Sequence, residues 1–265
     1  MPRSKSGWPV ASGSVGWPSP TRPRGPCWPP RFPPQGRWQN VPPTAIRDMF
    51  RRTFTRWGLP EAVRVDNGYP WGSPRDLPTE LALWLIGLGV AVIWNPPAQP
   101  RKNPKVERCQ GVAAAWAEPQ ACADPAALSA HLDWVGRVQC REYPSIGGST
   151  RVEAYPGLLI ARRAYQESQE PTLWELGRVD RWLSPRTWNR RVDQNGVISI
   201  YGHHHWVGRV YRGQDMTVRY DGLARQWVVR DQTGEVAWRF EARELSREAI
   251  LGLAVSRKRG RRQKS

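Results

Sequence analysis

Hydrophobic side chains recur at helical spacing in the segment Thr44–Trp57. The apolar positions that repeat along it are Ile46, Met49, Phe50, Phe54 and Trp57. Side chains at this spacing fall on one face of a helix, where they can be buried together. The sequence Gly58-Leu59-Pro60 follows, and glycine and proline are typical just beyond a helix end. We therefore predict an amphipathic helix over this segment.

Short apolar runs alternate with further helical segments after this helix. Ala62–Asp66 reads as a strand that Asn67-Gly68, a turn-forming pair, brings to an end. The next predicted elements are a helix over Thr79–Leu88, a buried strand over Val90–Trp94, and helices over Pro104–Trp116 and Pro125–Glu142. The order helix, strand, helix, strand, helix predicts an α/β arrangement, with Asp66 at the C-terminal end of a strand.

The two ends of the chain differ from this middle part. Residues 1–36 hold ten prolines, three Trp-Pro pairs and no acidic residue, and we expect them to be disordered. From Arg191 to Phe240, short alternating stretches are separated by turns at Asn195-Gly196, Asp221-Gly222 and Thr233-Gly234, which predicts about five strands in a small barrel. A short helix over Ser246–Val255 and a basic tail close the chain.

Composition narrows the class of partner. The 40 Lys and Arg residues exceed the 23 Asp and Glu residues, and the net charge of +17 favours a polyanion such as nucleic acid. A basic protein from a genome rich in arginine codons is the alternative. The four cysteines form no CxxC pair, and no run of about 18 apolar residues occurs, so we expect reduced thiols and a soluble, cytoplasmic protein.

Two carboxylates are candidates for metal chemistry. Asp66 ends a predicted strand, and Glu107 lies in the first turn of a predicted helix; such oxygen ligands suit Mg²⁺ or Mn²⁺. Each residue also has an ordinary explanation, because Asp before Asn-Gly forms turns and a first-turn Glu complements the helix dipole. His203-His204-His205 is not expected to bind a metal, since successive strand residues point to opposite faces.

The order of these motifs resembles the integrase core of the RNase H-like superfamily, in the form found in DDE-type transposases of bacterial insertion sequences. The matching stretches are Phe-Thr-Arg-Trp-Gly-Leu-Pro at 54–60, Val-Asp-Asn-Gly at 65–68, Ile-Trp-Asn-Pro-Pro at 93–97, Asn-Pro-Lys-Val-Glu-Arg at 103–108 and Glu-Ala-Tyr-Pro at 153–156. The resemblance runs from about Arg37 to the tail.

The resemblance implies metal-dependent DNA cleavage and strand transfer, with Asp66 and Glu107 as catalytic metal ligands. It also implies that double-stranded DNA, both element ends and target, is the partner, that the intact protein is a homo-oligomer, and that it associates with the bacterial nucleoid. DNA contacts are expected from Lys102, Asn103, Lys105 and Arg108, from Arg219 and Arg230 of the barrel, and from Arg257, Lys258, Arg259, Arg261 and Arg262 of the tail. The helix-borne basic residues could instead simply solvate an exposed surface.

The expected fold is an RNase H-like integrase core lacking its first strands, followed by a small all-β SH3-like barrel and a basic tail. The expected divisions are a disordered, out-of-frame segment at 1–36, a partial catalytic core at 37–160, a linker at 161–189, a DNA-binding barrel at 190–243, and a helix and tail at 244–265. The aromatic residues of the barrel, Tyr201, Trp206, Tyr211 and Trp227, are expected mostly in its core.

A complete family triad needs another Asp well upstream of Asp66, and the earliest acidic residue is Asp48, on the first predicted helix. Trp followed by Pro must be encoded TGG-CCN. In the reading frame that starts one nucleotide earlier, the same bases give NTG-GCC, which encodes Leu, Met or Val followed by Ala. In that frame an Asp codon can overlap Met1, 65 positions before Asp66. We therefore hypothesise a frame change near 32–35, whether programmed, mutational or a sequencing error. An upstream gene sequence that lacks an aspartate-bearing strand in the alternative frame would refute it.

Three functions stay open at this point. The first is a DDE-type transposase that is defective in catalysis because its first Asp is missing. The second is a non-catalytic DNA-binding remnant or regulator that occupies element ends or joins active subunits. The third is a general basic nucleic-acid-binding protein in which Asp-Asn-Gly occurs by accident.

Overall fold

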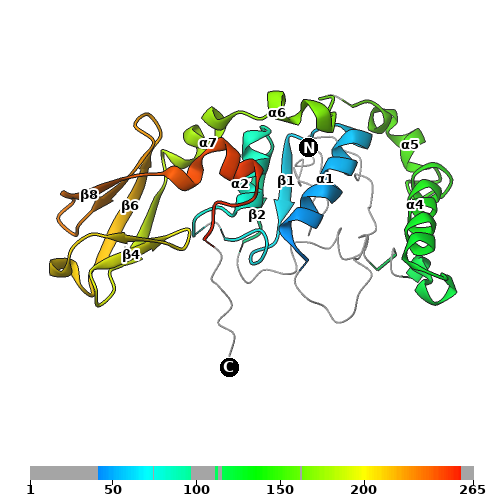
Figure 1. Cartoon of the computed structure of the whole chain (residues 1–265). Coiled ribbons are helices and arrows are strands. Elements are labelled where there is room, and N and C mark those ends of the chain that lie inside the picture. The colour runs from blue at the N-terminus through cyan, green and yellow to red at the C-terminus, as the bar shows by residue number, and fades with distance from the viewer. Residues whose placement is uncertain (1–40, 74, 97–110, 113–114, 162, 258–265) are drawn as a thin grey trace, which may run out of the picture. The chain divides into compact units, whose positions relative to one another are not determined.

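The computed structural model describes residues 41–73, 75–96, 111–112, 115–161 and 163–257, and shows a mixed α/β protein (Figure 1). The chain divides into two compact units. The first unit comprises residues 1–70 and 90–171, and the second comprises residues 71–89 and 172–265. Among the described helices, none is long and apolar enough to cross a membrane.

The first unit begins with α1 (Pro43–Trp57), which confirms the first predicted helix. Its buried face includes Phe50 and Phe54, whose ring centroids lie 5.4 Å apart. Gly58 ends the helix with φ 79°, and its N–H donates to the carbonyl oxygen of Phe54 at 2.7 Å. An alanine Cβ at this glycine would lie 2.6 Å from the carbonyl oxygen of Arg163, so the sharp exit from α1 requires glycine.

Two short parallel strands follow, β1 (Ala62–Val65) and β2 (Ala91–Trp94). Val63 and Val65 are fully buried, as expected for parallel strands covered on their faces. Both strands lie within one residue of the predicted bounds. Because parallel strands end at the same edge of a sheet, the residues after Val65 and Trp94 are brought together.

The remainder of the first unit is helical. Residues 111–112 and 115–117 are in helix, and α4 (Pro125–Arg141) confirms the predicted helix there, with the Asp124 side chain accepting from the N–H of Ala127 at 2.7 Å. The short helix α5 (Arg151–Ala154) has a capping box between Thr150 and Glu153. Shorter elements are η2 (Pro119–Ala121), η3 (Pro156–Leu159), η4 (Glu167–Gln169) and α6 (Glu170–Leu173).

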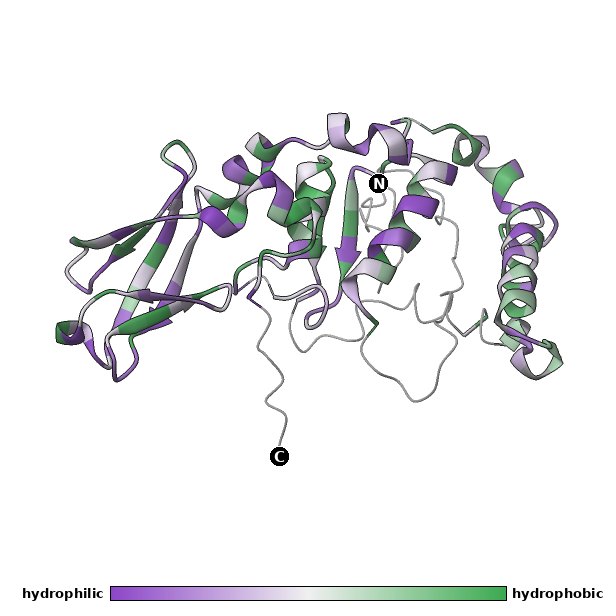
Figure 2. Ribbon diagram, viewed as in Figure 1, coloured by the Kyte–Doolittle hydropathy of each residue, from purple (hydrophilic) through white to green (hydrophobic). Residues whose placement is uncertain are grey.

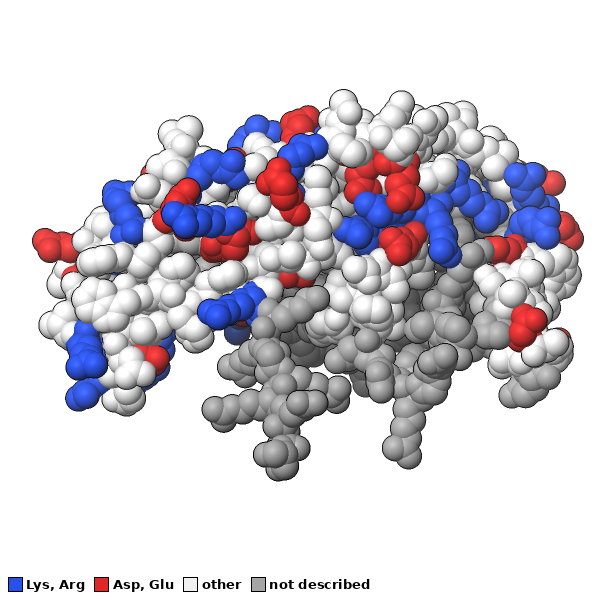
Figure 3. Space-filling view, viewed as in Figure 1, with Lys and Arg blue, Asp and Glu red and all other residues white. Residues whose placement is uncertain are grey.

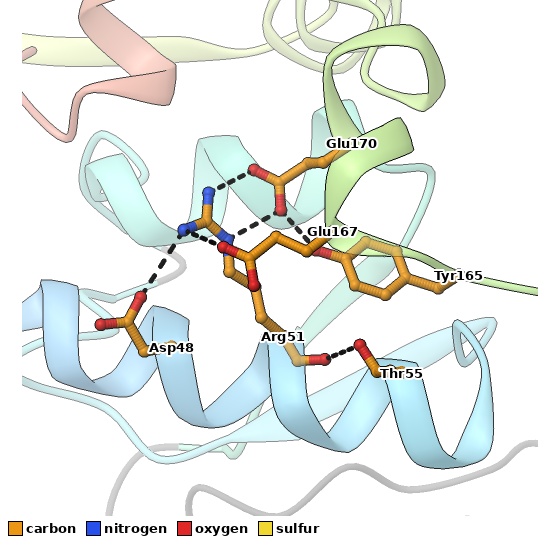
Figure 4. Close-up of polar contacts among 6 residues, drawn as sticks. All are labelled: Asp48, Arg51, Thr55, Tyr165, Glu167 and Glu170. Atoms are coloured by element: carbon orange, nitrogen blue, oxygen red, sulfur yellow. Dashed lines mark hydrogen bonds and ion pairs between the residues drawn. The ribbon is translucent and has the colours of Figure 1, made fainter.

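A partly buried ion pair connects the end of this unit to α1 (Figure 4). The Arg51 guanidinium donates to both carboxylate oxygens of Glu170, from Nε at 2.9 Å and from Nη2 at 2.7 Å. The Tyr165 hydroxyl donates to the same carboxylate at 2.5 Å, and Glu167 lies 3.1 Å from Arg51 Nη1. The hydrogen bond to Glu170 raises the pKa of Arg51, so the guanidinium stays charged.

The second unit is organised around α2 (Glu80–Gly87). Every residue of α2 from Leu81 to Gly87 is buried, and Figure 2 shows this helix as mostly hydrophobic. The helix contacts α7 (Leu176–Leu183) and α8 (Arg247–Leu251). The side chain of Trp174 packs against Gly87 and donates from Nε1 to the carbonyl oxygen of Trp84 at 3.0 Å.

The rest of this unit is antiparallel sheet. A four-stranded sheet has the order β3-β6-β7-β8, and β4 pairs only with β5 as a separate hairpin. The strands are β3 (Thr187–Arg191), β4 (Val197–Ile200), β5 (His203–Trp206), β6 (Asp215–Asp221), β7 (Gln226–Arg230) and β8 (Val236–Glu241). Along β6 and β7 the residues that alternate toward the core, including Met216, Val218, Tyr220 and Trp227, are buried.

The strands do not form the closed barrel expected from the sequence. No hydrogen-bonded ladder joins β5 to β8 within residues 163–257; the two strands meet through side chains instead. The rings of His205 and Phe240 lie 4.5 Å apart, and those of Trp206 and Trp238 lie 5.6 Å apart. The two strands are therefore in contact through aromatic side chains and not through backbone pairing.

The observed elements and compact units cross some of the predicted domain bounds. The segment 161–189, expected as a linker, contains α6, α7 and the start of β3, because Val179 and Leu183 form the buried face of an amphipathic helix. The helix predicted over Thr79–Leu88 belongs to the second unit rather than to the core expected at 37–160. Its apolar surface is covered by Trp174 and α7, which lie far along the chain and could not be paired with it by local pattern.

Candidate functional site

Asp66 lies directly after β1, at the C-terminal edge of the parallel pair, as the sequence predicted. Its side chain is exposed, and Oδ1 accepts from Nδ2 of Asn95 at 2.5 Å. Asn95 directly follows β2, and its N–H donates to the carbonyl oxygen of Val65 at 2.9 Å. The parallel register of the two strands therefore positions Asn95 to hold the Asp66 carboxylate.

Asn67 completes this small network. Its Nδ2 donates to the carbonyl oxygen of Asn95 at 2.8 Å, and Gly68 beyond it has φ 110°, which confirms the predicted turn. The side-chain Oδ1 of Asn95 is buried and has no hydrogen-bond partner. Sequence reasoning identified Asp66 but missed Asn95, although its place after the second strand of a parallel pair was a usable signal.

The described residues at this edge do not by themselves make a divalent metal site. They supply one carboxylate, whereas Mg²⁺ in proteins is commonly held by one or two carboxylates together with substrate oxygens, and a two-metal centre needs more. Glu107, the second expected ligand, lies outside the described residues. Within those residues, no group of three or more His, Cys, Asp or Glu side chains could hold a metal. Asp48 lies on α1 and pairs with Arg51 at 3.6 Å, so it belongs to the ion-pair cluster of the first unit.

A second candidate site is the outer face of the four-stranded sheet, where each strand contributes one exposed arginine. The four residues, which we call the arginine face, are Arg191 of β3, Arg219 of β6, Arg230 of β7 and Arg239 of β8. Their common orientation follows from the register, because Thr187 pairs with Arg219 and Val228 pairs with both Arg219 and Arg239. The same register places Asp215, Asp221 and Glu241 on this face, so acidic residues offset most of the arginine charge. Exposed arginines are nonetheless suited to contacts with a phosphate backbone.

Local contacts hold two of these arginines in place. Arg219 Nε donates to the carbonyl oxygen of Ser184 at 3.0 Å, and Arg230 Nη1 donates to that of Gly234 at 2.7 Å. Arg191 lies 3.8 Å from Asp215, and both side chains are well exposed. Arg219 and Arg230 were predicted from the sequence, whereas Arg191 and Arg239 were missed. Arg191 lies next to buried Val192, as Arg219 lies between buried Val218 and Tyr220, but no residue of β8 is buried beside Arg239.

The other expected DNA contacts are only partly described. The backbone N–H of Arg257 donates to the carbonyl oxygen of Tyr201 at 2.9 Å, which anchors the start of the tail to the second unit. The remaining tail residues Lys258, Arg259, Arg261 and Arg262, and the group Lys102, Asn103, Lys105 and Arg108, lie outside the described residues. On the face of the molecule shown in Figure 3, basic and acidic side chains are intermixed.

The aromatic residues of the sheet are only partly in its core. Trp227 is fully buried, as predicted, and donates from Nε1 to the Glu244 carboxylate at 2.6 Å. Trp206 is 53% exposed and Trp238 is 41% exposed, so the prediction was wrong for Trp206. These two side chains lie where β5 and β8 meet without backbone pairing, and that open junction leaves both rings accessible.

The three consecutive histidines alternate in exposure along β5, so successive side chains lie on opposite faces of the strand, as predicted. His203 and His205 are partly buried, and His204 is exposed. Nε2 of His203 lies 3.1 Å from the carbonyl oxygen of Val255, whereas Nε2 of His205 is buried without a hydrogen-bond partner. Burial lowers the pKa of His205, and the charge of Glu244 acts in the opposite direction.

This lowered pKa predicts an acid sensitivity. The unfolded chain binds the proton more readily than the folded chain, so stability is full above the ordinary His pKa of about 6.5 and declines as pH falls through the lowered folded value. We expect the urea midpoint to fall between about pH 7.5 and pH 5. The slope of the unfolding free energy against pH gives the number of protons that the chain takes up on unfolding. His205→Phe should lower this number by less than one, and the exposed control His204→Gln should leave it unchanged. Equal slopes for all three proteins would contradict the assignment.

Comparison with known families adds no assignment. A scan of the sequence against models of protein families finds no match.

Proposed function

We propose that this chain is a DDE-type, integrase-like transposase in which DNA binding is retained and catalysis is defective. The observation that carries the proposal is Asp66 at the C-terminal end of β1, hydrogen-bonded to Asn95 at the end of the adjacent parallel strand. Ligands of open α/β sheets are generally bound at the C-terminal ends of the strands. An exposed carboxylate fixed at that edge is well positioned for the role that the sequence resemblance implies.

The proposal extends to the fold family. Helix α1, strands β1 and β2, and the Asp66 turn are compatible with part of an RNase H-like core. The four-stranded sheet and the β4–β5 hairpin, in contact through Trp206 and Trp238, are compatible with an open form of an SH3-like barrel. The antiparallel sheet and the parallel pair lie in different units, as expected for separate catalytic and DNA-binding parts.

The catalytic defect is proposed because the sequence lacks one of the three carboxylates that the family resemblance implies. No acidic residue precedes Asp48 in the sequence, and Asp48 is engaged with Arg51. When bound, two divalent ions would activate the attacking oxygen and stabilise the leaving oxygen of the phosphodiester. The contribution proposed for Asp66 is one anchoring carboxylate, with Asn95 restricting its orientation; Glu107 is the second proposed ligand. One missing carboxylate leaves this set incomplete.

Duplex DNA is the proposed partner, and the intact family form is proposed to be a homo-oligomer associated with the bacterial nucleoid. Four arginines on one sheet face, followed by a basic tail, support contacts to the phosphate backbone. Contacts of this kind give affinity without sequence information. DNA recognition of element ends would therefore need further contacts to base edges.

The arginine face makes a specific prediction about salt. We expect Arg219→Gln combined with Arg239→Gln to weaken binding of the chain to duplex DNA and to reduce the slope of log K against log salt by about 0.9 for each lost phosphate contact, or about 1.8 in all. The matched control is Arg212→Gln with Arg243→Gln, two exposed arginines outside the four strands. If both pairs change the slope equally, the arginine face is not the contact surface.

A strand-transfer assay on a protein with the missing carboxylate restored distinguishes a defective transposase from a DNA-binding protein of another origin. In a gene returned to the alternative upstream frame, we expect Mg²⁺- or Mn²⁺-dependent strand transfer that Asp66→Asn abolishes while duplex binding is retained. Strand transfer that survives Asp66→Asn would contradict the role of Asp66. A restored protein that binds DNA and never cuts it would favour a non-catalytic regulator.

A further inference from the structure

Two exposed tryptophan side chains form an aromatic corner on the second unit, which we call the tryptophan corner. Trp206 of β5 is 53% exposed and Trp238 of β8 is 41% exposed. Their ring centroids lie 5.6 Å apart, and the ring planes meet at 89°. Single exposed apolar residues are common on protein surfaces, whereas large rings in contact form a continuous apolar patch of the kind that binding surfaces use.

The strands hold both rings in a fixed arrangement. Trp206 pairs across the β4–β5 hairpin with Val197, and Trp238 pairs across the β7–β8 ladder with Val229. The ring of Phe240 lies 6.2 Å from that of Trp238 and supports it from within the same strand. A surface that is already ordered loses little conformational entropy when a ligand covers it.

The right angle between the rings favours a flat ligand. A planar ring that stacks on one indole presents its edge to the face of the other, so one ligand makes both arrangements that aromatic pairs prefer. In the part of the chain that the structure describes, no group accepts a hydrogen bond from Nε1 of Trp206 or of Trp238. A ligand that covers these N–H groups has to supply acceptors at its edge, as the ring nitrogens and carbonyl oxygens of a nucleobase do.

The exposed area of the corner suits a small ligand better than a protein. Because a whole tryptophan side chain presents at most about 250 Å², the two exposed fractions together leave less than about 250 Å². A stable protein interface buries about 800 Å² on each partner. The tryptophan corner is therefore large enough for a flat ring and too small to hold a protein partner on its own.

The charged groups closest to the rings are arginines. No acidic residue neighbours either tryptophan in sequence or across its ladder, and Arg239 directly follows Trp238. Arg230 lies opposite Val236, two residues before Trp238, because the register shifts at this point. Both arginines are exposed. An anionic ligand is therefore favoured at the rings over a cationic one.

Three carboxylates farther along the same hairpin limit the strength of this attraction. They are Asp231 in the turn, Glu235 just before β8 and Glu241 at the end of β8. Glu241 pairs with Arg243 at 2.8 Å. Stacking on the rings then has to supply most of the affinity, while the arginines supply local phosphate contacts.

We propose that the tryptophan corner binds an unpaired nucleobase of single-stranded DNA by stacking, with Arg230 and Arg239 available to the flanking phosphates. The inference rests on the proposed function, because a protein that acts on DNA ends meets unpaired bases where those ends open. Every base can stack on an aromatic ring, so the corner would hold single strands with little regard to sequence. This contact differs from that of the arginine face, which needs only phosphates.

The test compares two single-stranded oligonucleotides of the same length, about ten nucleotides, at one salt concentration. One is oligothymidylate, and the other keeps the phosphates but has abasic sugars throughout. Fluorescence anisotropy should show the whole chain binding oligothymidylate about 5- to 150-fold tighter, the value of one stacked base. Trp206→Leu and Trp238→Leu should each lower this ratio, and the double variant should bring it close to one. Trp134→Leu, which removes a 48% exposed tryptophan of α4, is the matched control and should keep it.

A second readout uses the wild-type chain alone and does not depend on a variant being folded. An oligothymidylate that carries one iodouracil base should, on irradiation, form a crosslink that mass spectrometry assigns to Trp206 or Trp238. Equal affinity of the wild-type chain for the two oligonucleotides, or a ratio that the double variant retains, overturns the inference. Displacement of the oligonucleotide by a proline-rich peptide that the double variant does not bind overturns the assignment to nucleobases.

Duplex binding separates this inference from the function on which it rests. If duplex DNA binds with the salt dependence expected of the arginine face while oligothymidylate and the abasic strand bind equally, the tryptophan corner is rejected and DNA binding stands. If neither duplex nor single-stranded DNA binds, the proposed function fails together with the inference.

Discussion

Replacement of Gly87 by alanine is expected to destabilise the chain by about 3 kcal/mol or more, because the new methyl group has no room. An ideal Cβ at this position would lie 2.1 Å from Cε2 and Nε1 of Trp174. The indole cannot move away easily, since it is 1% exposed and donates from Nε1 to the carbonyl oxygen of Trp84. Chemical denaturation followed by circular dichroism measures the change.

A second glycine provides the matched control. Gly136 also lies inside a helix, α4, and an added Cβ there meets no atom within 4 Å. Gly136→Ala should therefore stabilise the chain by roughly 0.5–1 kcal/mol, as alanine usually does in a helix interior. If Gly87→Ala behaves like Gly136→Ala, then Trp174 does not pack against α2 as described.

Removal of the Arg51 side chain is the other change with a large expected effect. Arg51→Met would leave the Glu170 carboxylate, which is 4% exposed, without its bidentate partner. Removing one member of a buried pair typically costs about 3–5 kcal/mol, and we expect about 3 kcal/mol because the Arg51 side chain is 18% exposed and partly screened by water. The free energy of unfolding from urea titration is the measurement.

Two controls separate loss of the pair from loss of packing. The double variant Arg51→Met with Glu170→Met removes both charges, so it should recover most of the stability lost in the single variant. Arg243→Met breaks an exposed pair with Glu241, whose side chains are 83% and 64% exposed, and should have no measurable effect. A single variant as stable as the wild type would show that Glu170 is accessible to water in solution.

The local pattern of hydrophobic and polar residues predicted the individual helices and strands better than it predicted how they group into units. Helix α1, strands β1 and β2, and helix α4 follow from hydrophobic spacing and from residues such as Gly58 that end a helix, all of which act over a few positions. The assignment of α2 to the second unit depends on Trp174, which is distant in sequence. The open junction between β5 and β8 depends on aromatic packing between Trp206 and Trp238, which strand periodicity does not encode.

The residues of the candidate site likewise divide into those that local sequence predicts and those that depend on pairing between distant strands. Asp66 could be predicted because a short strand and an Asn-Gly turn identify a strand end within one stretch of sequence. Asn95 acts on Asp66 only through the parallel pairing of β1 with β2, so its role required the register. Arg191 and Arg239 likewise become part of one face only when the strand order β3-β6-β7-β8 is known. Residues that function through long-range pairing are not visible to local patterns.

The most direct test of the central proposal is one duplex DNA experiment with the whole chain in Mg²⁺, resolving bound from free DNA and intact from cut strands. We expect binding that weakens steeply between about 50 and 200 mM salt, with the strands left intact. Absence of binding at low salt, or binding that does not depend on salt, would contradict a DNA-binding role. Mg²⁺-dependent cutting that Asp66→Asn abolishes would contradict the proposed catalytic defect.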